Sequence, residues 1–185
     1  ILNDLATALV CRQDYRGAIP LFRESLKIRE RFYPENHPDR ILGLNALGYG
    51  LLLAGERREA RRYLQAALEA QERTLGPNDL QVALCLQGVG ELDRLEGRFD
   101  RARALLERSL AVSKKSTDFG AFDTLVSLGL LDESQGRLAE AIDHLGRAHE
   151  ICAHSPGLWI RVPSPDYARV LRKAGRIAEA EKIEA

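Results

Sequence analysis

The sequence predicts an all-α fold of repeated helix pairs, four complete and a fifth truncated, because three series of residues recur with the same succession of intervals. Each series advances along the chain by 42, 42, 39 and 39 residues. The first series, of small residues, consists of Ala6, Gly48, Gly90, Gly129 and Ala168. The second series is one alanine in every unit, at Ala18, Ala60, Ala102, Ala141 and Ala180. The third series follows the first by seven residues, at Gln13, Gly55, Gly97, Gly136 and Gly175.

The first helix of each unit is predicted around the first series, where large apolar residues flank the small one, as Leu47 and Leu51 flank Gly48. A glycine inside a helix costs roughly 1 kcal/mol relative to alanine. We therefore expect the missing side chain of Gly48 to let two helices cross closely. Gly50 lies in the same stretch, "ALGYGLLLAGERREA" (46–60), but outside the series.

Each first helix is expected to end at the third series, because glycine tolerates the left-handed backbone conformation that terminates a helix. The second helix then carries the alanine of the second series, a bulky residue four positions later and a small residue three beyond that. The bulky residues are Phe22, Leu64, Leu106 and Leu145. Spacings of three and four place these residues on one helical face.

Polar residues that can cap free amides precede the first helices of units two to five, in NHPD (36–39), PND (77–79), STD (116–118) and SPD (164–166). In order along the chain, helices are predicted near 1–12, 15–32, 39–54, 57–75, 79–96, 99–115, 119–135, 138–153, 165–174 and 177–185. These helices pair into units near 1–38, 39–78, 79–117, 118–156 and 157–185.

The order of a small residue, a turn glycine and then A-x-x-x-[bulky]-x-x-[small] resembles the tetratricopeptide repeat. That family has a period of about 34 residues, and the extra length here falls between units. The longer form is similar to the repeats of kinesin light chain, most of all in "LNDLATAL" (2–9) and "SLKIRERFYPENHPD" (25–39). The resemblance implies one right-handed α-solenoid over residues 1–185, with first helices that line a concave groove.

Charge and composition exclude several classes of function. The 27 basic and 27 acidic residues balance, so no global field favours nucleic acid or an anionic membrane. The longest apolar stretch, near 47–54, is too short to span a bilayer, and no signal-peptide pattern opens the chain. Cys11, Cys85 and Cys152 are odd in number and lack motif spacing, which favours reduced thiols in a cytoplasmic protein. The chain begins within a repeat pattern and lacks methionine, so we expect a piece of a longer polypeptide.

Candidate binding residues follow from the resemblance, in which peptides lie in the groove against side chains of the first helices. Asn3, Asn45 and Gln87 stand three places before the small residue of their units, where kinesin light chains are similar in carrying groove asparagines. A carboxamide both donates and accepts, so it can pair with a peptide main chain whatever its sequence. Val126 breaks this series in unit four. The complete predicted groove set is Asn3, Thr7, Asn45, Tyr49, Leu52, Gln87, Glu91 and Arg94.

The alternative is that these polar side chains are solvated surface groups without a binding role, since exposed polar residues are common on helices. In the binding hypothesis, Asn45 and its equivalents pair with the peptide main chain. Tyr49 or Leu52 then offers apolar contact.

The segment "HSPGLWIRVPSP" (154–165) departs from the repeat, because Pro163 and Pro165 delay the start of the next helix. We expect Leu158, Trp159 and Ile160 in an extended connection, and packing of Trp159 between units four and five is the favoured interpretation. The alternative is that this connection contacts a partner, since aromatic residues are frequent interface anchors.

Two further clusters carry weaker signals. The basic run "ERREARR" (56–62) also holds acidic residues within pairing distance, so a solvated face is favoured over nucleic-acid binding.

Among His144, His149, Cys152 and His154, only His149 and Cys152 share a helical face, and two ligands do not close a zinc site. No nucleophile-elbow, zinc-protease, phosphate-loop or C-x-x-C motif occurs.

The sequence therefore predicts a protein-interaction scaffold that binds a peptide or protein, with no enzymatic activity, cofactor, metal, nucleic acid or membrane partner. An alternative is a sensor or regulatory segment of a larger bacterial signalling enzyme, either a nucleotide-driven switch or a protease, with contacts to flanking domains. A third interpretation is a spacer, in which substitutions in the groove leave binding unchanged. Repeats of this kind are present in many unrelated proteins, so the pattern indicates the fold more sharply than the function.

Overall fold

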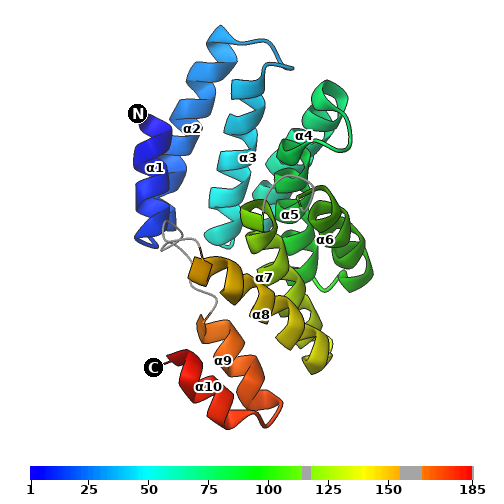
Figure 1. The fold of residues 1–185 in the computed structure, drawn as a ribbon. Coiled ribbons are helices and arrows are strands. Elements are labelled where there is room, and N and C mark those ends of the chain that lie inside the picture. Colours follow the sequence, from blue (N-terminus) through cyan, green and yellow to red (C-terminus); the bar gives the residue numbers. More distant parts are fainter. Residues whose placement is uncertain (114–117, 155–163, 185) are drawn as a thin grey trace. The chain divides into compact units, whose positions relative to one another are not determined.

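The computed structural model describes residues 1–113, 118–154 and 164–184, and in these ranges the regular structure is entirely helical (Figure 1). The helices are α1 (Leu2–Cys11), α2 (Tyr15–Phe32), α3 (Pro38–Leu53), α4 (Arg57–Leu75), α5 (Leu80–Leu95), α6 (Phe99–Ser113), α7 (Asp118–Ser134), α8 (Leu138–His154), α9 (Ser164–Lys173) and α10 (Ile177–Glu184). The predicted all-α fold is confirmed, and every predicted helix is present within two residues of its expected bounds.

The turn prediction is also confirmed. Gly55, Gly97, Gly136 and Gly175 have φ angles of 83°, 78°, 74° and 77° and follow α3, α5, α7 and α9. Gln13 takes the same place after α1 with φ of 62°. The left-handed conformation ends each first helix, because the chain there turns back at once into the second helix.

The chain forms two compact units, Ile1–Leu92 and Asp93–Ala185, each built from consecutive helices packed on one another. In unit 1, α1 packs on α2, α2 on α3 and α3 on α4. In unit 2, α6 packs on α7, α7 on α8, α8 on α9 and α9 on α10. Helix α5 contributes residues to both units, since the division falls between Leu92 and Asp93.

The small residues of the first series lie where two helices of a pair cross closely. A Cβ added to Gly48 would come 2.8 Å from Leu64 Cγ and 3.0 Å from the Leu64 main-chain nitrogen. At Gly129 the same atom would come 2.5 Å from Leu145 Cγ. A backbone atom that close cannot move aside without moving its helix, so only a residue without a side chain fits beside Leu64.

Gly50 has a separate role that the repeat pattern did not reveal. An added Cβ there would lie 3.0 Å from Cδ2 and Cε2 of Phe22, a core residue of α2. The glycine therefore makes room for an aromatic ring of the preceding unit, at a position where α5 carries the buried Leu92.

Two buried carboxylates, Asp93 and Asp132, stabilise the turns after α5 and α7. The sequence analysis did not identify them. Asp93 accepts hydrogen bonds from Arg98 Nε and Nη2 at 2.9 and 2.8 Å, and its side chain is fully buried. Asp132, one repeat later, is also fully buried, and its Oδ1 lies 3.3 Å from Arg137 Nη2. The carboxylate of Asp132 also receives Arg103 of α6 at 2.5 Å and His144 of α8 at 2.8 Å, so it joins three helices of unit 2.

Candidate functional site

The predicted groove residues lie on the first helices of their units, spaced by four and three residues along each helix. Asn3 and Thr7 belong to α1, Asn45, Tyr49 and Leu52 to α3, and Gln87, Glu91 and Arg94 to α5. Residues at these spacings share one side of a helix. All but Arg94 lie in unit 1, and Arg94 falls just past its end.

Asn3 and Asn45 share an unusual feature. Both side chains are half-buried, and the Oδ1 atom of each is shielded from solvent without a hydrogen-bond partner. The two residues are 42 positions apart and occupy equivalent places on α1 and α3. A desolvated acceptor without a donor costs about 1–3 kcal/mol, so a rotation of either side chain that brings its oxygen to a donor would be favourable.

Other members of the set are held more firmly by the fold. Gln87 is only 5% exposed and already has an interaction within the chain. Thr7 is exposed, and its Oγ1 donates to the main-chain oxygen of Asn3, one helical turn earlier, at 2.9 Å. Tyr49, Glu91 and Arg94 are half-buried and also interact within the chain.

Leu52, which we expected to offer apolar contact, is 5% exposed and belongs to the core. Exposed apolar surface on the same helices comes instead from Leu42 and Leu84, each 39% exposed. Leu42, Asn45 and Tyr49 follow one another at spacings of three and four, so they share a face of α3. The signal that could have found Leu42 and Leu84 is their separation of 42 residues, equal to the repeat.

The matching positions in unit 2 are closed by packing and ion pairs. Val126, which breaks the carboxamide series, is 2% exposed. Glu133 of α7 accepts hydrogen bonds from Arg169 of α9 at 3.0 and 2.7 Å and from Lys173 at 2.7 Å. Arg172 makes a bidentate pair with Glu184 of α10. The charged groups on these helices therefore neutralise one another within unit 2.

The cluster around Glu133 makes the stability of unit 2 dependent on pH. The hydrogen bond from Arg169, assisted by Lys173, outweighs the effect of burial and lowers the pKa of Glu133 from 4.5 to about 2. A carboxylate whose pKa falls on folding contributes its stability above the unfolded value and loses it as the pH drops through the folded value. The relevant window is therefore from about pH 4.5 down to about pH 2.

We expect Glu133→Gln to lower the free energy of unfolding by about 1–2 kcal/mol near neutral pH, allowing for the exposure of the two cations. The difference between variant and parent should shrink through the acidic window. Urea unfolding followed by circular dichroism at a series of pH values measures it. Glu140→Gln, on the exposed side of α8, is the matched control. A Glu133→Gln deficit that is equally large at acidic pH would contradict the prediction.

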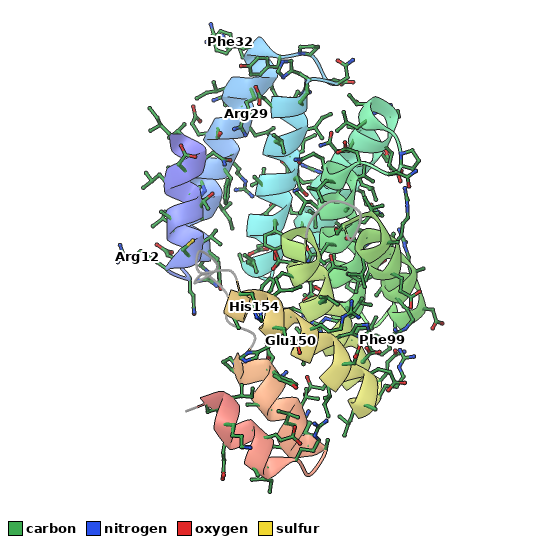
Figure 2. The ribbon with its side chains drawn as sticks, in the orientation of Figure 1. Arg12, Arg29, Phe32, Phe99, Glu150 and His154 are labelled. Carbon is green, nitrogen blue, oxygen red and sulfur yellow. The ribbon has the colours of Figure 1, made fainter. Side chains whose placement is uncertain are left out.

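The connection residues Leu158, Trp159 and Ile160 lie outside the described residues. The histidines near them have separate surroundings. The His149 ring lies 5.8 Å from that of Tyr167, and His154 Nδ1 is 2.8 Å from the main-chain oxygen of Glu150 at the end of α8 (Figure 2). Within residues 1–113, 118–154 and 164–184, no three histidine, cysteine or acidic side chains are grouped to hold a metal ion.

Glu59 and Arg62 of the basic run on α4 contact side chains outside the run. Glu59 pairs with Arg23 of α2 at 2.6 Å, and the Arg62 guanidinium stacks over the Tyr63 ring at 5.1 Å.

Burial, with a smaller effect of Glu72, raises the pKa of the Cys85 thiol to about 12, so this thiol is protonated at neutral pH. None of the described helices is long and apolar enough to cross a membrane.

Comparison with known proteins supports the repeat assignment. The profile of the tetratricopeptide repeat family matches residues 1–73 and 43–115. Protein KINESIN LIGHT CHAIN-RELATED 3 of Arabidopsis thaliana is 26% identical over 146 residues, which cover 76% of this chain. The chain spans 22% of that relative.

Solved structures share the fold. A kinesin light chain from Podosopora anserina with nearly identical TPR-like repeats has a TM-score of 0.70 at 19% identity, covering 98% of this chain and 89% of that one. BtubC (BKLC) from P. vanneervenii has a TM-score of 0.73 at 19% identity, covering 98% and 75%. Aspartyl phosphate phosphatase F from Bacillus subtilis has a TM-score of 0.73 at 15% identity, covering 96% and 46%. At these identities the likeness concerns the solenoid architecture alone.

Proposed function

The chain belongs to the tetratricopeptide repeat family, with repeats like those of kinesin light chain, and from this premise we propose that it binds an extended peptide segment along α1, α3 and α5. Repeats of this family generally mediate protein–protein interactions and have no enzymatic activity of their own. The proposal adds which helices carry the site and what chemistry recognises the peptide.

The observation that carries this proposal is the pair of equivalent carboxamides of Asn3 and Asn45, whose Oδ1 atoms lack a hydrogen-bond partner and would gain one by turning outward to a peptide. They stand at equivalent places on neighbouring first helices of unit 1. A peptide main chain presents N–H donors at regular intervals, so it can satisfy both atoms at once. Because each carboxamide also donates, the same side chains accommodate the peptide carbonyls.

Apolar side chains of the peptide are proposed to contact Leu42 and Leu84, which replace the buried Leu52 in this role. Both leucines retain exposed surface on the helices that carry Asn45 and Gln87. Main-chain pairing would give affinity for many sequences, and the two leucines would favour peptides with apolar residues at matching places.

The mechanism is the presentation of a preformed surface. Asn45 stands on a helix held against α2 and α4 by close glycine crossings at Gly48 and Gly50. A rigid surface loses little conformational entropy on binding, so more of the interaction energy appears as affinity. Most of the conformational entropy lost on binding would then be lost by the peptide, which becomes ordered. The alternative of a regulatory segment in a signalling enzyme remains a prediction from the sequence.

We expect Asn45→Ala to weaken peptide binding by about tenfold or more, the equivalent of about 1.4 kcal/mol. The reason is that alanine can neither accept from nor donate to the main chain. Peptides selected from a displayed random library on the immobilised chain supply the ligands. Fluorescence anisotropy then gives Kd for the parent and for each variant.

Asn36→Ala, which removes an exposed carboxamide from the loop before α3, is the matched control and should leave Kd unchanged. Leu42→Ser should weaken only those peptides that carry an apolar residue at the facing place. Circular dichroism must show equal helix content in all variants. Selected peptides that bind Asn45→Ala and Leu42→Ser as tightly as the parent would place the binding surface elsewhere.

A further inference from the structure

A pocket opens between the loop that joins α2 to α3 and the C-terminal end of α4. Its volume is about 550 Å³, and it is lined by Glu35, Asn36, Ala70, Arg73 and Thr74. Figure 1 shows this loop and the last turn of α4 at the same end of unit 1. Small-molecule sites in proteins typically enclose about 300–1,000 Å³. The pocket is therefore large enough for a small ligand, and none of its residues belongs to the groove set.

The pocket contains opposite charges that do not pair with one another. Glu35 comes from the loop, and Arg73 comes from the last turn of α4. Among the described residues, no carboxylate pairs with the Arg73 guanidinium and no cation pairs with Glu35. Elsewhere in unit 1, opposite charges on neighbouring elements do pair, as Arg23 does with Glu59 at 2.6 Å. An unpaired carboxylate and an unpaired guanidinium in one pocket favour a ligand that carries both charges itself.

The hydrogen bonds already present determine which atoms remain for a ligand. Arg73 Nε donates to the main-chain oxygen of Glu69 at 3.3 Å, so its two Nη groups are the donors that remain. Thr74 Oγ1 donates its only proton to the main-chain oxygen of Ala70 at 2.7 Å, so its oxygen can only accept. An ionised Glu35 also only accepts, whereas the carboxamide of Asn36 does both. The pocket therefore presents donors at Arg73 and acceptors at Glu35, Asn36 and Thr74.

The buried side of the pocket is apolar and held by the core. Ala70 is 8% exposed and packs with Ile41, Ala67 and Cys85. The other four lining residues are exposed. Because Ala70 contributes only a methyl group, recognition of a ligand depends on the polar side chains around it.

We propose that this pocket binds a small zwitterion with the chemistry of a free α-amino acid. The carboxylate of the ligand accepts from the Nη groups of Arg73. The ammonium group has three N–H donors, and these match the oxygens of Glu35, Asn36 and Thr74. Hydrogen bonds to ionised groups are about twice as strong as those between neutral groups. The pocket lies apart from the groove set, and the proposal does not depend on peptide binding there.

The test titrates each standard L-amino acid in turn into the full chain by isothermal titration calorimetry. We expect saturable binding of at least one of them. Arg73→Gln and Glu35→Gln should each weaken that binding by about tenfold or more, because each removes one charged partner of the ligand. The methyl ester of the same amino acid lacks the carboxylate charge and should bind the parent about tenfold more weakly. Arg73→Gln should bind the ester no more weakly than the parent does.

Two control variants separate this pocket from other surfaces. Arg58→Gln removes an exposed guanidinium from the first turn of α4 and should leave amino-acid binding unchanged. Asn45→Ala, which tests the groove, should also leave it unchanged, so the two proposals fail independently. Glu35 and Arg73 are exposed, and circular dichroism verifies that their replacement retains the helices. The inference is overturned if no amino acid binds the parent saturably, or if Arg73→Gln or Glu35→Gln binds it as tightly as the parent does.

Discussion

Replacing Gly129 by valine is expected to lower the free energy of unfolding of unit 2 by about 3 kcal/mol, the upper part of the range for overpacked cores. The new Cβ would come 2.5 Å from Leu145 Cγ and 3.0 Å from Leu145 Cδ2. Leu145 is fully buried and belongs to the main core cluster of unit 2, so its side chain has no free space to enter. Helices α7 and α8 must separate to accommodate the valine, which loses contacts along their whole crossing.

Urea unfolding followed by far-ultraviolet circular dichroism measures this effect. The matched control is Ala139→Val, which places the same side chain on the exposed side of α8. That change should cost about 0.5 kcal/mol, the difference in helix propensity alone. Equal unfolding midpoints for the two valine variants would mean that the helices do not cross closely at Gly129.

Replacing Asp132 by alanine is expected to cost about 3 kcal/mol, because an ionic cluster loses the buried carboxylate that joins its three cations. Asp132 is fully buried, and Arg103, Arg137 and His144 lie at 2.5, 3.3 and 2.8 Å from its oxygens. Without the carboxylate, Arg103 and Arg137 repel one another, and Arg103 keeps only the longer contact with Glu107 at 3.7 Å. The cluster joins α6, α7 and α8, so its loss weakens several helix contacts together.

Asp143→Ala is the matched control for this experiment. Asp143 is exposed and its carboxylate lies 3.5 Å from Arg147 of the same helix. Exposed ion pairs of this kind contribute about 0–1 kcal/mol. Thermal and urea unfolding of the two variants should therefore differ clearly. If Asp132→Ala were no less stable than Asp143→Ala, the ion pairs of the buried carboxylate would do no more than offset the cost of removing it from water.

The candidate site could be predicted from the sequence in part. Three residue series established the register, and the register placed Asn3, Asn45 and Gln87 at equivalent positions. Exposure could not be predicted in the same way. Leu52 and Leu42 are both leucines on α3, yet one is 5% and the other 39% exposed, because neighbouring helices cover different sides of α3. The pairing of Glu133 with Arg169 joins residues 36 positions apart on α7 and α9, a distance that no local pattern spans.

The sequence by itself determined the helices, their turns and their pairing into repeats. These features depend on local chemistry: the 3.6-residue period of apolar side chains, polar caps, and glycine at the positive φ angles after α3, α5, α7 and α9. Only the tertiary structure decided the burial of Asp93 and Asp132 and the role of Gly50 against Phe22. The physical reason is that burial depends on which helix lies opposite a side chain, and that neighbour is distant in the sequence.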